Sequence, residues 1–413
     1  ERERRVECWA AMSQHGSGGA AAAASSSLRE CARVLRRGVR TVLLDCDGVL
    51  FRGPVAVPGA VQALRVLREE HHLRLLFITN SSRLRRAALR DSLLRMGFQG
   101  VHMEDVFNTS YATGLLLRQL LGMRDSVTSS GPALEAEVGD SDIAATVSLS
   151  DSEEESAAAT AGVSGLHKRM SCDSREQQGP AGERGQGEAH EEEAPLLYVI
   201  GEEGLLEELR NAGFRVLAGQ DVDTGKYRES EFASRPIDPK IRAVVVGYDS
   251  SVSMERIAYA AVCLREIPDC LFVSTNADST FPHGDRLLPG AGTVMAAVSH
   301  AAEREPMIVG KPSAMLWEVL QHRFHLTREN SVMVGDRIDT DLRFARNAGI
   351  PCFLVLTGVT DAERDADLIA QSAPDAVLPS VASLAQALED FPQEDFPQEE
   401  AEEPPLPPNS PTC

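Results

Sequence analysis

Short apolar runs alternate with helical patterns along the chain from about residue 33 to residue 390. The apolar runs lack polar alternation, which is typical of strands buried on both faces of a parallel sheet. Between them, leucine and valine recur at helical spacing, for example in residues 61–67 and 89–94. This alternation predicts an α/β fold with a doubly wound parallel sheet. The predicted strands are residues 42–45, 73–78, 196–201, 242–247 and 270–274.

Three segments lack this pattern. Residues 1–32 pass from mixed charge into Gly/Ala/Ser-rich sequence, residues 125–194 are rich in Ser, Glu, Gly and Ala, and residues 391–413 are rich in Pro and Glu. Because such compositions bury too little apolar surface to fold alone, we expect all three to be disordered, the central one as a loop insertion. The chain does not begin with methionine, so we expect either that Met12 is the true start or that the sequence is a fragment.

Composition narrows the classes of partner. The formal net charge of −21 and the aromatic content of 5% argue against a nucleic-acid partner, although a local cationic site could still bind a small anion. No apolar run approaches the length of a membrane span, and no secretory signal is recognisable. The eight cysteines form no CxxC pair or zinc spacing, which favours reduced thiols and, by default, a cytoplasmic location.

Two aspartates, Asp45 and Asp47, stand at the end of the first predicted strand. Reacting groups in open α/β sheets lie beyond the carboxyl ends of the strands, and residues two apart on an extended chain share a side. Two carboxylates in one small space need a cation or a proton. We therefore interpret the pair as a Mg²⁺-dependent phosphoryl-transfer centre. Asp45 would attack phosphorus to form an aspartyl-phosphate, and Asp47 would act as general acid and then general base.

Three further motifs follow predicted strands in the same order along the chain. The hydroxyl of Thr79 and the N–H groups of Asn80 and Ser81 could hold phosphate oxygens. Lys311 supplies a positive charge for the same anion. Any one of these elements alone is a weak signal, since Thr79-Asn80 could equally be an ordinary turn. The four motifs together predict one phosphoryl-transfer site.

The last motif carries two more aspartates, Asp336 and Asp341. Asp336, with the carboxylate of Asp45 and the backbone carbonyl of Asp47, suits the all-oxygen coordination of Mg²⁺. Alone, Asp336 could be a helix cap. Asp341 either reaches the metal through water or holds Lys311 in place.

These four motifs resemble those of the haloacid dehalogenase superfamily, at residues 45–50, 77–83, 309–313 and 333–341. More closely, the chain resembles the branch containing phosphoglycolate (glycerol-3-phosphate) phosphatase and pyridoxal phosphate phosphatase (chronophin), with further matches at residues 57–60, 245–249, 289–292 and 356–359. The resemblance implies a Mg²⁺-dependent phosphomonoesterase, a hydrolase with a Rossmann-like core, an inserted α/β cap and homodimerisation through that cap. The core would comprise residues 33–108 and 305–390, and the cap residues 109–304.

The resemblance also implies that the cap selects the substrate. Residues 276–283 lie where pyridoxal phosphatases carry a Trp-His-Pro sequence that contacts the pyridine ring. Phe281 stands in place of that histidine, and His283 follows two positions later as a candidate substrate contact or a solvated loop residue. We therefore expect a small phosphorylated metabolite, 2-phosphoglycolate or glycerol 3-phosphate. The alternatives are pyridoxal 5′-phosphate, a phosphoprotein, or a non-catalytic role as an anion-binding module or scaffold.

Overall fold

The computed structural model describes residues 18–123, 193–283 and 286–396, with the side chains of residues 18–23 and 282–283 left out. Both of its larger sheets lie in one unit, to which the described residues 18–123 and 194–396 belong apart from the gap at 284–285. Nearly all of the expected insertion, residues 125–194, lies outside the described residues, as do residues 1–17 and 397–413.

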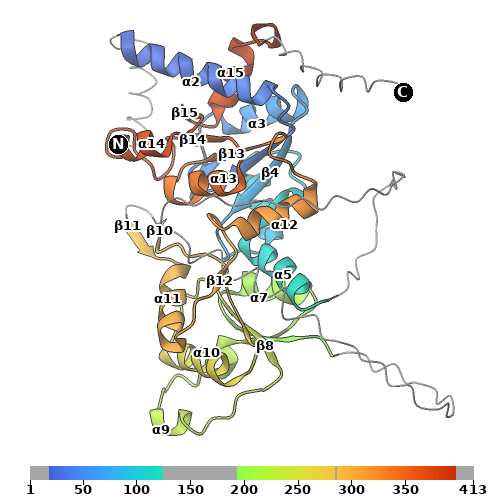
Figure 1. Ribbon diagram of the computed structural model, residues 1–413, viewed down its shortest axis with the longest axis vertical. Coiled ribbons are helices and arrows are strands. Elements are labelled where there is room, and N and C mark those ends of the chain that lie inside the picture. The colour runs from blue at the N-terminus through green and yellow to red at the C-terminus, as the bar shows by residue number, and fades with distance from the viewer. Residues whose placement is uncertain (1–17, 124–192, 284–285, 397–413) are drawn as a thin grey trace, which may run out of the picture. The chain divides into compact units, whose positions relative to one another are not determined.

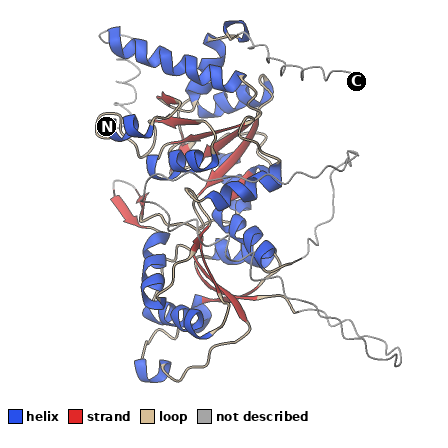
Figure 2. Ribbon diagram, in the orientation of Figure 1, coloured by secondary structure: helices blue, strands red, loops and turns tan. Residues whose placement is uncertain are grey.

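A six-stranded parallel sheet carries the first motif near its centre (Figures 1 and 2). In sheet order its strands are β15 (Ala376–Leu378), β14 (Cys352–Val355), β13 (Ser331–Gly335), β1 (Thr41–Asp45), β4 (Arg74–Thr79) and β5 (Val106–Asn108). Every residue of β1 is buried, as its unbroken apolar run predicts. In register, Asp45 lies beside Ile78 and Leu44 beside Val334. The carboxyl ends of β1, β4 and β13 therefore meet at one edge.

Helices cover both faces of this sheet (Figure 1). Val42 and Leu44 of β1 join one apolar cluster, and Leu43, which points to the opposite face, joins another. The first cluster includes residues of α2 (Gly18–Arg36), α3 (Ala60–Glu69), α4 (Arg86–Arg95) and α15 (Ala382–Asp390). The second includes residues of α5 (Thr109–Leu120), α12 (Ala314–Phe324) and α13 (Arg343–Ala348). This arrangement confirms the doubly wound α/β core.

The inserted region forms a second, five-stranded parallel sheet. In sheet order its strands are β12 (Met307–Ile308), β9 (Leu271–Ser274), β8 (Ile241–Val246), β6 (Leu196–Ile200) and β7 (Arg215–Ala218). One face packs against α10 (Met254–Glu266) and α11 (Ala291–Ala302), and the other shares the second cluster with α7 (Glu203–Asn211). Short elements complete this part: α8 (Gly219–Val222), α9 (Glu229–Phe232) and the antiparallel pair β10 (Thr280–His283) and β11 (Arg286–Pro289).

The structure differs from expectation at three boundaries. Residues 18–36 are helical, although we expected disorder through residue 32, because Cys31, Ala32 and Leu35 recur at helical spacing and bury one face of α2 against the core. Strand β12 belongs to the second sheet, so the inserted region extends to residue 308 rather than 304. Past residue 390, Phe391 and Phe396 still pack on the core.

None of the helices in the described ranges is both long enough and apolar enough to cross a membrane.

Candidate active site

Lys311 is the residue around which the expected site residues gather. Its Nζ lies 2.5 Å from Oδ1 of Asp45 and 2.7 Å from Oδ1 of Asp341, and its side chain is 2% exposed. Burial alone would lower the pKa of Lys311, but the carboxylates of Asp341 and Asp45 raise it well above the usual value. The ammonium group is therefore held charged in the interior.

Asp45 ends β1 and points into the same buried space. Burial raises the pKa of Asp45 to about 7, with Asp341 adding to the shift and the charge of Lys311 opposing it. A carboxylate in this position needs positive charge beyond that of the single lysine to stay fully ionised at neutral pH.

Asp336 follows β13 and is almost completely buried. Its Oδ2 accepts a hydrogen bond of 2.5 Å from the backbone N–H of Val359, while its Oδ1 is buried without a hydrogen-bond partner among the described residues. Burial, Asp341 and Asp45 together raise the pKa of Asp336 well above its usual value. An orphaned carboxylate oxygen of this kind indicates a site for a ligand that the protein itself does not supply.

The three buried carboxylates are close enough to share one cation. Asp45, Asp336 and Asp341 each offer an oxygen that lies within 4.8 Å of the other two. An all-oxygen ligand set with an unpaired oxygen on Asp336 fits a hard divalent cation such as Mg²⁺. The side chain of Asp47 is not a member of this group; the ligand expected from Asp47 was its backbone carbonyl.

The remaining contacts of Asp341 explain its burial. It lies on η2 (Ile338–Leu342), and its Oδ2 accepts hydrogen bonds of 3.1 Å from the backbone N–H groups of Asp336 and Arg337. Its other oxygen faces Lys311. Asp341 was expected either to reach the metal through water or to hold Lys311. Its direct contact with Lys311 fits the second role.

Two glycines make space for Asp336. A Cβ at Gly358 would lie 1.7 Å from Oδ2 of Asp336, and one at Gly48 would lie 2.6 Å from the same atom. Thr360 donates from Oγ1 to the backbone carbonyl of Asp336 at 2.6 Å. Residues 358–360 were not expected to shape this site, although residues 356–359 match the family branch. The available signal was a glycine just beyond β14, at the sheet edge where the aspartates stand.

Asp47 differs from the other aspartates in its exposure. Much of its side chain reaches solvent, yet the surrounding protein raises its pKa, while the nearby charge of Arg52 lowers it. A raised pKa is the direction required of a carboxyl group that must deliver a proton.

The predicted phosphate loop after β4 is tied directly to Lys311. Oδ1 of Asn80 accepts a 2.8 Å hydrogen bond from the backbone N–H of Lys311, and Nδ2 of Asn80 donates a 2.9 Å bond to the backbone carbonyl of Lys311. Thr79 is buried, and its Oγ1 accepts a 3.1 Å bond from the backbone N–H of Ser81. Two of the groups expected to contact phosphate therefore pair with each other here.

The inserted region also reaches Asn80. Nδ2 of Asn80 donates to the carboxylate of Asp278 at 3.1 Å, and Nδ2 of Asn276 donates to the carbonyl of Asn80 at 2.8 Å. Burial raises the pKa of Asp278, and Arg337 opposes the shift. The sequence reasoning named this segment for substrate selection but missed its bond to Asn80. The sequence signal for this bond was two polar residues, Asn276 and Asp278, just beyond β9.

His283 is described only by its backbone. Its backbone is in β10, in register with Arg286 of β11, and its side chain lies outside the described residues, so its role stays a prediction. Phe281 of the same strand packs edge-to-face on Tyr248, with ring centroids 5.3 Å apart.

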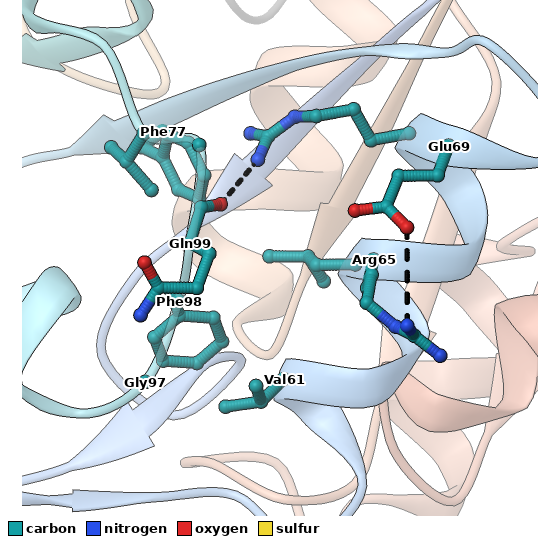
Figure 3. A pocket seen from close by; sticks show the side chains of 11 residues that line it. Val61, Arg65, Glu69, Phe77, Gly97, Phe98 and Gln99 are labelled. Carbon is teal, nitrogen blue, oxygen red and sulfur yellow. Dashed lines mark hydrogen bonds and ion pairs between the residues drawn. The ribbon is translucent and has the colours of Figure 1, made fainter.

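A cavity of about 100 Å³ lies elsewhere, between α3 and residues 97–101 (Figure 3). Its walls include Val61, Phe77 and Phe98, and Arg68 at its edge donates to the carbonyl of Gln99 at 2.5 Å. None of the nine predicted site residues lines it. This mainly apolar cavity is separate from the carboxylate cluster.

Comparison with known families gives two matches. A family described as haloacid dehalogenase-like hydrolase matches residues 42–144, and one described as HAD-hydrolase-like matches residues 308–384. The first range contains Asp45 and Asn80, and the second contains Lys311, Asp336 and Asp341.

Curated relatives align over most of the chain. Glycerol-3-phosphate phosphatase of Mus musculus is 32% identical over 92% of this chain and 100% of the relative. Chronophin of Mus musculus is 32% identical over 84% of this chain and 93% of the relative. Phosphoglycolate phosphatase 2 of Arabidopsis thaliana is 29% identical over 85% of this chain and 94% of the relative. Among solved structures, glycerol phosphate phosphatase from Mycobacterium tuberculosis in complex with calcium shows a TM-score of 0.56 at 25% identity, covering 85% of this chain and 76% of that one.

Proposed function

The chain belongs to the haloacid dehalogenase-like hydrolases and is a phosphomonoesterase that acts on small phosphorylated metabolites, and we propose that its substrate is 2-phosphoglycolate or glycerol 3-phosphate. The observation that carries the proposal is the buried Lys311 between Asp45 and Asp341, with Asp336 alongside. The relatives named for glycerol 3-phosphate and phosphoglycolate support the substrate class.

In the proposed reaction, a carboxylate oxygen of Asp45 attacks phosphorus and the ester P–O bond breaks. The leaving alkoxide takes a proton from Asp47, whose raised pKa favours the protonated form. Water then attacks the phosphorus of the aspartyl-phosphate, Asp47 removes its proton, and Asp45 is released with inorganic phosphate.

Lys311 supplies the fixed positive charge of this site. Its ammonium group would face phosphate oxygens, while Asp341 and the two hydrogen bonds between Asn80 and the backbone of Lys311 keep the residue in place. Thr79 and Ser81 would reach the phosphate by exchanging their mutual hydrogen bond for bonds to its oxygens.

Mg²⁺ is the proposed cofactor, held by Asp45, Asp336 and the carbonyl of Asp47. The orphaned oxygen of Asp336 supports this assignment. When bound, the cation would offset negative charge on the phosphoryl oxygens. The relative from Mycobacterium tuberculosis, whose structure is in complex with calcium, supports a divalent-cation site.

The inserted region, expected at residues 109–304, is the proposed cap; α5 at its start also packs with helices of the core, and β12 just beyond its expected end belongs to the second sheet. The bonds that Asp278 and Asn276 make to Asn80 support a role at the substrate entrance. Homodimerisation through this cap and a cytoplasmic location stay predictions. Sedimentation of the purified chain would test the first, since a monomer at micromolar concentration would contradict it.

The function is tested by phosphate release with Mg²⁺ from 2-phosphoglycolate, glycerol 3-phosphate, pyridoxal 5′-phosphate and a phosphotyrosine peptide, with Asp45→Asn as the inactive control. We expect clear preference for the two aliphatic esters. Preference for pyridoxal 5′-phosphate or the peptide would overturn the substrate assignment. No turnover of any ester by folded protein would favour the anion-binding or scaffold alternative.

A further inference from the structure

Arg83 lies against two aromatic rings. Its guanidinium carbon is 5.1 Å from the ring centroid of Tyr248 and 5.2 Å from that of Phe281. The two ring planes are nearly perpendicular, at 89°. The three residues come from separate segments: the loop after β4, the loop after β8, and β10. Cation–π attraction to two rings restricts the guanidinium group without using its N–H donors.

No carboxylate neutralises this arginine within the described part of the chain. Its side chain is exposed and makes neither an ion pair nor a hydrogen bond there. The next two arginines are different, since Arg85 lies 3.1 Å from Glu207 and Arg86 lies 3.5 Å from Glu208. Arg83 therefore offers a charged N–H edge that the protein itself leaves available.

The position of this group follows from the loops that carry it. Arg83 is three residues beyond Asn80, which holds Lys311, and Phe281 is three residues beyond Asp278, which accepts from Asn80. Between these points, the hydroxyl of Ser82 accepts a 3.4 Å bond from the backbone N–H of Tyr248. The cluster of Arg83, Tyr248 and Phe281 is therefore carried by the same loops that hold Asn80 and Asp278 beside the proposed phosphate site.

We infer that Arg83 is a specificity-determining residue that binds a carboxylate on the substrate. A planar guanidinium pairs with a carboxylate through two parallel N–H···O bonds, and the cation–π contacts with Tyr248 and Phe281 do not use these N–H donors. The inference rests on the proposed function and narrows it. It selects a phosphate ester that bears a carboxylate, such as 2-phosphoglycolate, over glycerol 3-phosphate, whose remaining polar groups are uncharged hydroxyls.

The negative charge of Asp278 could oppose such a substrate, whereas the nearby carboxylate of Asp339 is paired with Arg337. The carboxylate of Asp278 accepts a bond from Asn80 and interacts with the positive charges of Arg337 and Lys311. Because Asp278 has these partners, Arg83 is not required to neutralise it and can pair with the ligand.

The test compares Arg83→Gln with a matched control, Arg85→Gln, which removes an arginine two residues away that is paired with Glu207. Steady-state kcat/KM is measured with Mg²⁺ for 2-phosphoglycolate and glycerol 3-phosphate. We expect Arg83→Gln to lower kcat/KM for 2-phosphoglycolate roughly 10- to 100-fold, the loss expected when one charged hydrogen-bonding partner is removed, mainly through KM. Glycerol 3-phosphate should change less than about 3-fold, the control should change neither substrate, and Arg83→Lys should recover part of the loss.

Equal losses for both substrates would assign Arg83 a structural role and overturn the inference, as would unchanged turnover of 2-phosphoglycolate. The inference would also be overturned by a wild-type enzyme that cleaves p-nitrophenyl phosphate but shows no preference for the carboxylate-bearing ester. Failure of folded wild-type protein to cleave any of these esters would instead overturn the proposed function, and the inference with it.

Discussion

Replacing Gly358 by alanine is a direct test of how Asp336 is positioned. A Cβ there would lie 1.7 Å from Oδ2 of Asp336, 2.2 Å from its Cγ and 2.4 Å from its own Cβ. Real Cβ atoms do not come within 3.0 Å of such neighbours, so either the carboxylate or the backbone must move by more than about 1 Å. The φ angle of Gly358 lies outside the left-handed region, so alanine adds no backbone strain and the effect is steric.

The expected magnitude has two parts. Overpacking at a buried site costs about 1–3 kcal/mol of unfolding free energy. Displacing a reacting or metal-holding group by about 1 Å costs on the order of 100-fold in rate. Gly358→Ala should therefore lower kcat about 100-fold and raise the Mg²⁺ concentration for half-maximal activity, because Asp336 would no longer meet Asp45 in the same geometry.

The assay is Mg²⁺-titrated phosphate release together with urea unfolding. Gly122→Ala is the control, since its Cβ meets no atom within 4 Å but its φ of +66° makes alanine unfavourable. The control should lose about 1–2 kcal/mol of stability and keep its activity. Gly358→Ala with wild-type kcat and Mg²⁺ dependence would refute the assignment of Asp336 to the reaction.

Three other predictions concern the nucleophile, the metal and the thiols. Asp45→Asn should abolish phosphate release and leave the melting temperature unchanged or higher, because it removes one of three crowded carboxylates; substantial residual turnover would exclude Asp45 as nucleophile. Excess chelator should stop the reaction and Ca²⁺ should not restore it, because its longer bonds and higher coordination number misplace the phosphate; full activity in chelator would disprove the metal requirement. The five described cysteines are buried and their thiols have raised pKa values. In a variant with the other three cysteines replaced by serine, a disulfide reagent should therefore react only when denaturant is added. Rapid labelling of the native protein would contradict this.

The core sheet was predictable because its signal is local. An unbroken apolar run before Asp45 indicates a buried parallel strand, and polar residues after several such runs must meet at one sheet edge. The burial of α2 was not predictable because the helix begins in alanine- and serine-rich sequence, whose composition is typical of disorder. Its apolar face, which includes Cys31 and Leu35, lies in the second half of the helix. Composition describes a segment alone, whereas burial depends on the surface against which it packs.

The sequence predicts which side chains belong to the site but not which of them contact one another. Sequence order alone left Asp341 either near the metal or near Lys311, since five residues beyond Asp336 allows both. The 2.7 Å contact with Lys311 depends on how η2 turns after β13. The bond between Asn80 and Asp278 joins residues 198 positions apart, and no local pattern encodes it.

The charges of the site explain why cation and substrate should bind together. Asp45, Asp336 and Asp341 carry three negative charges when ionised, and Lys311 carries one positive charge. Burial, together with the neighbouring negative charges, raises the pKa values of Asp45 and Asp336. A divalent cation would balance the remaining two negative charges and keep Asp45 ionised for attack. Because a phosphate dianion would otherwise enter a negatively charged site, substrate affinity should rise as the metal site fills.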